Sequence, residues 1–171
     1  MTHITQLDPN TSEPKDFLHT YQVLKQLSAT PTTVGQLMFR RGIKKSYEGS
    51  ATVRHILHWA AQHGLVTQAL GIIKGKEYEV FSLTIRGETW LDNNWVRYNS
   101  QLNPTVYARW QALNSFRTCK EAMDMKFLRR LVKLGFVWEN PDLRGQFHIT
   151  HAGLDWLRAH DHLFALSEEA A

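Results

Sequence analysis

Apolar residues recur three and four positions apart in several stretches of this chain, a spacing that gathers them on one face of an α-helix. In the first half of the chain these stretches cover residues 16–27, 32–41 and 50–63. Ser50 is a suitable N-cap for the third stretch, and Gly64 follows its last turn, where helices commonly end. We therefore predict three helices in this part of the chain.

The pattern changes to alternation after the third predicted helix. Residues 65–68 and 77–84 have the composition and period of half-buried strands. The intervening residues 69–76, ALGIIKGK, contain two glycines and are predicted to form the turn of an antiparallel ribbon. Lys74 and Lys76 would then lie at the tip of this ribbon.

One motif occurs twice in the chain. Residues 81–91 read FSLTIRGETWL and residues 147–157 read FHITHAGLDWL, so Phe, an aliphatic residue, Thr, Gly, Trp and Leu recur 66 positions apart in one register. A basic helical segment that ends in Gly precedes each copy. Self-similarity of this kind indicates a duplicated structural unit. We interpret the shared residues as the cap, close contact and core of a strand-to-helix junction, not as a functional signature.

The repeat predicts two domains, each built from helices and a two-stranded ribbon. We place the first at residues 15–100 and the second at residues 104–160, with Pro104 ending any helix that continues from the first. Residues 1–14 are polar and are predicted to be a flexible arm. Residues 161–171 are predicted to be a short C-terminal tail.

The second unit is less clearly marked than the first. Its first helix is predicted from Val106, but no turn residue occurs between Thr118 and Gly135. The next two helices are therefore either fused or separated by a tight turn. The ribbon that follows is shorter than in the first unit, and Arg144 lies near its tip.

Two segments carry a resemblance to a known family. TVRHILHWAAQHGLV (residues 52–66), followed by a ribbon and YEVFSLTIRG (residues 78–87), resembles the third helix and wing of winged helix-turn-helix domains of the MarR, ArsR and PadR type. FLRRLVKLGFV (residues 127–137) with FHITHAG (residues 147–153) resembles the same pattern. The resemblance implies a mainly α fold with small β wings (α+β), two winged-helix domains in tandem, and double-stranded DNA as the partner.

Positive charge is concentrated in the segments that such domains place against DNA. The whole chain has 20 basic and 16 acidic residues, so its net charge of +4 says little about a nucleic-acid partner. Residues 40–76 hold seven basic residues and one acid, and residues 106–135 hold seven basic residues and two acids. The first stretch therefore carries +6 and the second +5.

The resemblance assigns roles to residues on the outward faces of the helices and at the ribbon tips. Thr52, Arg54 and His55 would occupy major-groove reading positions, and Arg54 could pair with a guanine edge at about 1 to 3 kcal/mol of discrimination. The remaining cations would make phosphate or minor-groove contacts, which fix register but carry little sequence information. The candidate DNA-binding residues are Arg40, Arg41, Lys44, Lys45, Thr52, Arg54, His55, His58, Lys74, Lys76, Arg117, Lys120, Lys126, Arg129, Arg130, Lys133 and Arg144.

Sequence-specific binding of double-stranded DNA, in the manner of a small transcriptional regulator, is the function that these observations predict. Two alternatives stay open. A basic helix face is also an ordinary solvated surface, and Trp59, if exposed beside the reading helix, would favour a non-catalytic scaffold that binds a protein partner. The chain could also form a homodimer through Trp95, Trp110 and its C-terminal helix.

We expect no enzyme activity, cofactor or metal site. His148 with His151 and His160 with His162 have ligand-like spacings, but no carboxylate or cysteine cluster accompanies them. The single cysteine, Cys119, excludes an intrachain disulfide and fits a reducing compartment. The apolar runs are too short to span a membrane and the N-terminus lacks a secretory signal, so we predict a cytoplasmic protein without a membrane partner.

Overall fold

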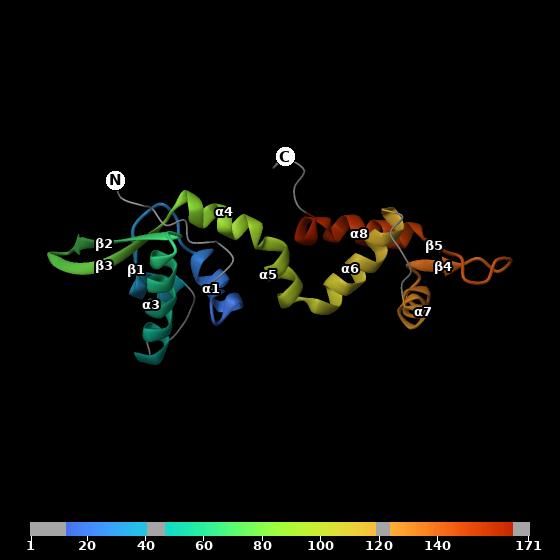
Figure 1. Ribbon diagram of the computed structural model, residues 1–171, viewed down its shortest axis with the longest axis horizontal. Helices are drawn as coiled ribbons and strands as arrows, with labels where there is room; N and C mark the ends of the chain where they lie inside the picture. Colours follow the sequence, from blue (N-terminus) through green and yellow to red (C-terminus); the bar gives the residue numbers. More distant parts are fainter. Residues whose placement is uncertain (1–12, 41–46, 119–123, 166–171) are drawn as a thin grey trace, which may run out of the picture. The chain divides into compact units, whose positions relative to one another are not determined.

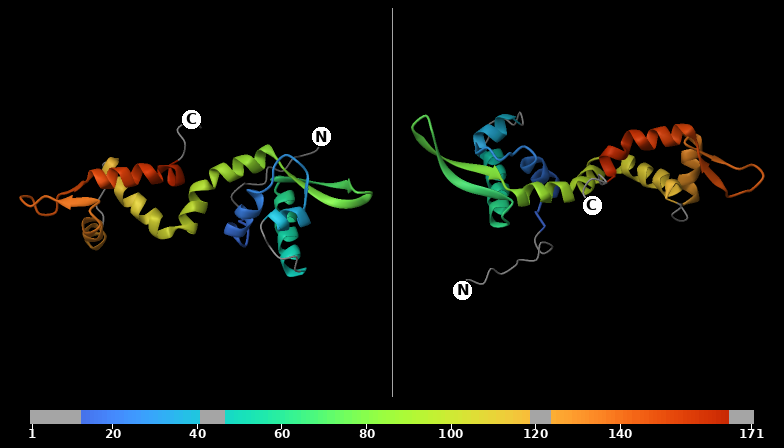
Figure 2. Two further views of the ribbon diagram at one scale, coloured as in Figure 1. Left: turned by 180° about the vertical axis from the view of Figure 1, so that it is seen from behind. Right: turned by 90° about the horizontal axis from the view of Figure 1, so that it is seen from above.

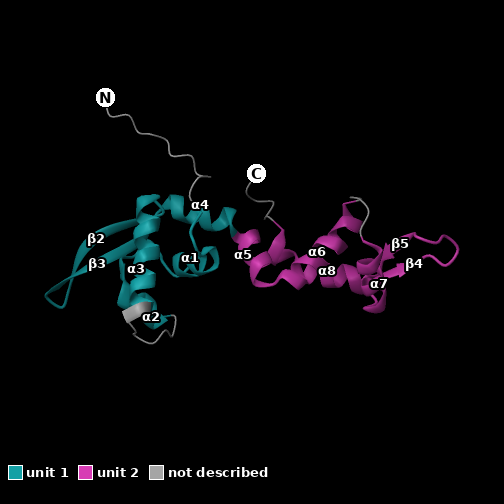
Figure 3. Ribbon diagram, turned by 60° about the horizontal axis from the view of Figure 1, so that its bottom comes forward, with its two compact units in different colours: residues 1–94 teal, residues 95–171 magenta. Residues whose placement is uncertain are grey.

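The computed structural model describes residues 13–40, 47–118 and 124–165. The chain divides into two compact units, residues 1–94 and 95–171, which Figure 3 colours separately. Both units are mainly helical and each contains a small antiparallel sheet, which confirms the predicted α+β class. None of the helices in the described ranges is long and apolar enough to cross a membrane.

The first unit contains the three predicted helices, the ribbon and a further helix after it. In chain order its described elements are α1 (Phe17–Leu24), β1 (Thr32–Thr33), α2 (Val34–Arg40), α3 (Tyr47–Gln62), β2 (Val66–Ile73), β3 (Lys76–Leu83) and α4 (Ile85–Asn93) (Figure 1). The strands form an antiparallel sheet in the order β1-β3-β2, so the short β1 and the long β2 flank β3.

The core of the first unit forms where α3 packs against the other helices and the sheet. Val53, Leu57 and Ala60 share one face of this helix by their three- and four-residue spacing, and all three are buried. They lie in one apolar cluster with Leu24 of α1 and Phe81 of β3. The periodicity of the sequence therefore identifies the buried side of this helix correctly, which leaves its other side for solvent or a partner.

Two boundaries in the first unit differ from the prediction. Helix α3 begins at Tyr47, so Ser50 lies within the helix instead of capping it. Strand β2 continues to Ile73, and the turn consists only of Lys74 and Gly75, with φ values of 52° and 75°. Both turn residues thus have the positive φ that the commonest two-residue hairpin turn requires. The apolar residues before them favour extended backbone, which is why they extend the ribbon.

The second unit repeats the helix and ribbon arrangement with shorter strands. Its described elements are α5 (Trp95–Leu102), α6 (Pro104–Arg117), α7 (Met125–Lys133), β4 (Val137–Glu139), β5 (Phe147–Ile149) and α8 (His151–Phe164). Leu113, Leu131 and Leu157 are buried in its core. Helices α6 and α7 are separate, because α6 ends at Arg117 and a new N-cap, Asp124, precedes α7.

The boundary between the units lies before Trp95, not near Pro104. Helix α5 packs in the second unit, where the side-chain amide of Asn99 donates to the carbonyl of Leu163 at 3.1 Å. Pro104 begins α6 at a first-turn position, where its missing N–H removes no helical hydrogen bond. Residues 95–100, which we assigned to the first domain, therefore belong to the second unit.

Helix α8 extends into the predicted C-terminal tail. Its last residue, Phe164, is buried in the core of the second unit. Asp161, one turn earlier, accepts a hydrogen bond from the indole N–H of Trp110 at 2.9 Å. Residues 161–164 are thus part of the folded unit, and residues 166–171 lie outside the described range.

The repeated motif builds the same strand-to-helix junction in both units. The hydroxyl oxygens of Thr84 and Thr150 accept main-chain N–H groups in the first turn of α4 and α8, at 3.0 and 3.1 Å. The same hydroxyls donate backwards to the carbonyls of Gly64 at 2.8 Å and Gly135 at 2.6 Å. Each threonine therefore caps one helix and ties it to the glycine that ended an earlier helix.

The motif's glycine is explained by close packing at this junction. A Cβ atom placed on Gly87 would collide with the carbonyl of Leu65, and one placed on Gly153 would collide with the carbonyl of Phe136. Both glycines are buried. The two copies share this geometry, which supports a structural role for the motif.

Candidate nucleic-acid interface

Helix α7 presents the most concentrated positive charge in the described structure. The carboxylate of Asp124 accepts the main-chain N–H of Lys126 at 3.0 Å and so caps the helix. Leu128 and Leu131 point into the core of the second unit and are buried, which fixes the rotation of the helix about its axis. The polar residues of α7 are consequently held on its outer side.

Four cations occupy that outer side, which we call the α7 basic face: Lys126, Arg129, Arg130 and Lys133. All four are exposed. Helix α7 contains no acidic residue, so the helix carries +4. Among the described residues, none of the four has an ion-pair partner. Their charge is therefore available to an external anion.

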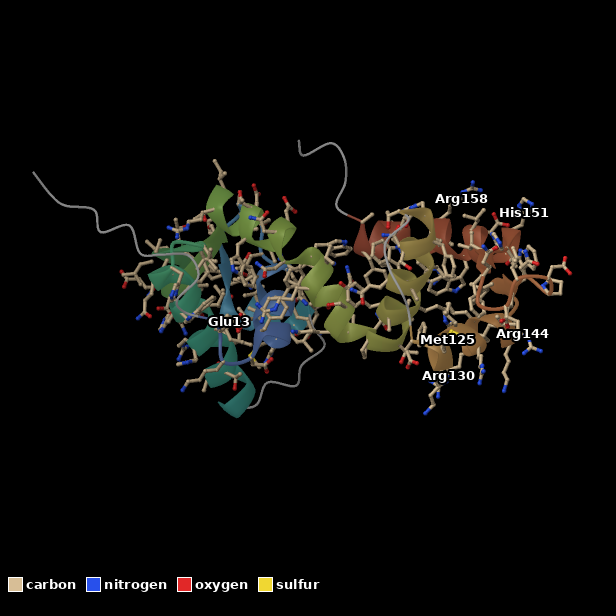
Figure 4. All side chains as sticks on the ribbon, turned by 45° about the vertical axis from the view of Figure 1, so that its right-hand side comes forward. Glu13, Met125, Arg130, Arg144, His151 and Arg158 are labelled. Atoms are coloured by element: carbon tan, nitrogen blue, oxygen red, sulfur yellow. The ribbon has the colours of Figure 1, made fainter. Side chains whose placement is uncertain are left out.

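The β4–β5 ribbon adds a further cation and an exposed aromatic pair. Arg144 lies in the turn of the ribbon and is exposed. Figure 4 shows Arg130 and Arg144 projecting from one side of the second unit, whereas Arg158 of α8 projects from the opposite side. The indole of Trp138 stacks on the imidazole of His148 with 5.0 Å between ring centroids. The α7 basic face and Arg144 can thus approach one polyanion together.

Arg117, another predicted DNA contact, is occupied inside the second unit. Its guanidinium pairs with the carboxylate of Asp161 at 2.8 Å and its Nε donates to the side-chain oxygen of Asn114 at 3.0 Å. The ion pair with Asp161 joins α6 to α8. We therefore reassign Arg117 from a DNA contact to a structural cation, because an external phosphate would have to displace the Asp161 carboxylate.

In the first unit, Glu79 of β3 contacts two of the residues that we assigned to DNA, Arg54 and His58. The Nε of Arg54 lies 3.6 Å from one carboxylate oxygen of Glu79. The other oxygen lies 3.0 Å from the Nε2 of His58 and accepts the side-chain amide of Gln68 at 2.6 Å. This cluster links the outer face of α3 to the ribbon. Arg54 and His58 are accordingly engaged with an acid instead of being held ready for a base edge.

The remaining α3 candidates are exposed as predicted, but the helix has little charge. Thr52 and His55 lie on its exposed side. With Glu48 and Arg54 as its only formally charged residues, α3 has a net charge of zero. This neutral helix contrasts with the +4 of α7.

The ribbon of the first unit is also neutral overall. Lys74 and Lys76 are exposed at its tip, as predicted, but Glu77 and Glu79 follow directly on β3. The four charges cancel. The charge count of residues 40–76 ended before these two acids. Extending it to Glu79 would have shown from the sequence that the ribbon is neutral.

Arg40, at the end of α2, borders a hollow on the first unit. Its guanidinium donates to the carbonyl of Gln26 at 3.4 Å. The hollow has a volume of about 430 Å³ and is lined by Thr33, Gly35, Gln36, Phe39, Arg40, Ile73 and Tyr78. This lining is mainly apolar and holds a single charged side chain, so it offers no set of acid, base and nucleophile for catalysis. Arg41, Lys44, Lys45 and Lys120 lie outside the described residues.

Two tryptophans that we considered for protein interfaces are packed within their own units. Trp59 is partly buried and packs on the core of the first unit. Its indole stacks on His63 at 4.4 Å and meets Trp90 edge-on at 6.4 Å. Trp110 is buried in the second unit. The condition on which Trp59 would favour a protein scaffold, full exposure beside α3, is therefore not met.

One histidine of each pair with ligand-like spacing is engaged by a neighbouring residue. His148 stacks on Trp138, and the Nδ1 of His160 lies 2.7 Å from the carbonyl of Trp156. Among the described residues no group of three His, Cys, Asp or Glu side chains is arranged to hold a metal ion. Cys119 lies outside the described ranges.

Comparison of the sequence with protein families and curated proteins identifies no relative. No protein-family model matches the chain, and no curated protein matches it. The functional assignment therefore depends on the geometry and charge of the sites described above.

Proposed function

We propose that this chain binds double-stranded DNA, with the α7 basic face and Arg144 as its main contact. The observation that carries the proposal is the set of four exposed cations on one side of α7, none of which pairs with an acid among the described residues. Such charges release counterions when they neutralise phosphates, which favours association. The apolar inner side of the helix holds them in one orientation.

A tandem winged-helix architecture is part of this proposal. In its favour, the first unit has the order helix, short strand, two helices and antiparallel ribbon. The second unit shares the threonine-capped junction and a helix and ribbon before it. In this scheme α7 and the β4–β5 ribbon correspond to α3 and the β2–β3 ribbon. Among the described residues of the second unit, no helix lies between α6 and α7 that would correspond to α2.

Sequence-specific reading and a role in transcriptional regulation extend the proposal. We assign base reading to Thr52, Arg54 and His55 of α3, and backbone contact to α7. Arg54 would have to exchange the Glu79 carboxylate for a guanine edge, so base reading would be weaker than backbone contact. We therefore expect modest sequence preference on top of a salt-dependent, general affinity for duplex DNA.

A protein-interaction scaffold is the second candidate, and the first unit favours it. Leu70 and Ile72 on β2 are 75% and 76% exposed. Large apolar side chains that remain in water on one surface often mark a protein interface. This candidate assigns the first unit to a protein partner and does not use the α7 basic face.

A fluorescence anisotropy titration separates the two candidates. The full chain is titrated into a labelled duplex of random sequence at a low and a high salt concentration, with bovine albumin in place of the chain as a background control. DNA binding predicts an affinity that falls steeply with salt. Absence of binding at the lower salt concentration would refute the DNA proposal and leave the scaffold candidate.

A further inference from the structure

Strand β2 lies at an edge of its sheet. The strand order β1-β3-β2 places β3 beside β2 on one side, and among the described residues no strand pairs with β2 on its other side. The strand is eight residues long and reads VTQALGII, without a charged residue or a proline. Natural proteins usually protect an edge strand with charges, prolines, bulges or short length. Strand β2 has neither charges nor prolines, and it is not short.

The ladder geometry shows which main-chain groups are turned outward. Ile73 and Lys76 flank the two-residue turn and therefore form the hydrogen-bonded pair that closes it. Hydrogen-bonded and non-hydrogen-bonded pairs alternate along an antiparallel ladder. Gln68, Leu70 and Ile72 consequently direct their N–H and C=O groups away from β3, along the open edge.

Leu70 and Ile72 also expose their side chains. Alternation places both on one face of the ribbon, and they are 75% and 76% exposed. Figures 1 and 2 show the β2–β3 ribbon projecting beyond the helices of the first unit in each view. The open edge therefore combines unpaired main-chain groups with apolar side chains, which is the surface that strand addition uses.

We propose that the partner at this edge is a second copy of the chain, whose β2 pairs with this β2 antiparallel about a two-fold axis at Leu70. In this register Leu70 lies opposite Leu70 of the second copy, and Ile72 lies opposite Gln68. The outward main-chain groups of all three residues then meet their counterparts. A two-fold interface requires a self-complementary surface, and β2 meets this requirement because it opposes no like charges.

The neutrality of β2 also decides against a charged peptide as the occupant. Strand β2 has no charged residue, so an acidic or basic strand would find no opposite charge beside it. Glu77 and Glu79 lie on β3, one strand further from the open edge. Trp110, one of the residues through which the chain could form a homodimer, is buried inside the second unit, whereas the contact proposed here uses the first unit. The inference does not depend on DNA binding, since the first unit alone carries it.

The mass of the full chain in solution, measured by light scattering without DNA, tests the proposal. We expect a species of twice 19.8 kDa at high concentration that dissociates on dilution. Leu70→Lys places two like charges opposite each other and should leave only the single-chain mass under the same conditions. The matched control is Ile85→Lys, which changes an 83% exposed apolar residue on α4 and should keep the wild-type mass.

A charge-reversal mixture tests the register. Leu70→Glu should also be monomeric, but an equimolar mixture of Leu70→Lys and Leu70→Glu should recover the doubled mass, because opposite charges then face each other. A wild-type chain that stays at the single-chain mass at every concentration would overturn the proposal and assign the edge to another protein. An unchanged mass of Leu70→Lys, or a mixture that stays monomeric, would overturn the pairing about Leu70.

Discussion

Replacing two arginines of the α7 basic face gives the sharpest test of the proposed DNA contact. Arg129→Ala combined with Arg130→Ala removes two of the five exposed cations of the proposed DNA contact, the others being Lys126, Lys133 and Arg144. Both arginines are exposed and neither has an ion-pair partner among the described residues. Their removal should therefore leave the fold intact, which a thermal unfolding curve verifies.

The magnitude follows from counterion release. Each neutralised phosphate lowers the slope of log K against log salt by about 0.9, so five contacts give a slope of about −4.5 and three give about −2.7. Between about 50 and 200 mM salt, the wild type should lose about 500-fold in affinity and the double variant about 40-fold. The difference between the two slopes is about 1.8, which is the quantity to measure.

The assay is a series of anisotropy titrations with one mixed-sequence duplex across this range of salt. Arg86→Ala combined with Arg158→Ala is the matched control, because it also removes two positive charges, but from exposed positions outside α7. The control should keep the wild-type slope. Equal slopes for the control and the α7 variant would refute the assignment of DNA contact to α7, since the loss would then reflect net charge alone.

Three further changes test other parts of the structure. Gly153→Ala should destabilise the second unit by about 1 to 3 kcal/mol, because the added Cβ would collide with the carbonyl of Phe136. Urea denaturation measures this loss of stability, and an unchanged midpoint would contradict the tight junction. Arg117→Ala should cost about 1 kcal/mol of stability by the same method and leave the DNA salt slope unchanged, because the arginine is paired inside the unit. Glu79→Gln should strengthen DNA binding and increase the affinity difference between duplex sequences, because it releases Arg54 from its ion pair. Competition titrations measure both effects, and weaker binding would argue against base reading by α3.

The helices and the repeated junction could be predicted from the sequence because both depend on local patterns. The inner face of α3, with Val53, Leu57 and Ala60, follows from helical periodicity alone. The junction follows from the spacing of Thr84 and Gly87, repeated at Thr150 and Gly153, since a capping hydroxyl accepts a main-chain N–H two or three residues further along the helix. The exposed cations of α7 were predicted for the same reason.

The tertiary structure decided which of the candidate charges remain available. Arg117 and Asp161 are 44 positions apart, and Arg54 and Glu79 meet only because β3 folds beside α3. No local pattern encodes such pairings, because they depend on which surfaces come together. The same holds for Trp59, whose burial requires Trp90 from another helix, and for β2, whose open edge exists only once the strand order is known. The sequence alone thus determined the helices, the repeat and the basic segments, whereas tertiary packing determined that α7, and not α3, presents free positive charge.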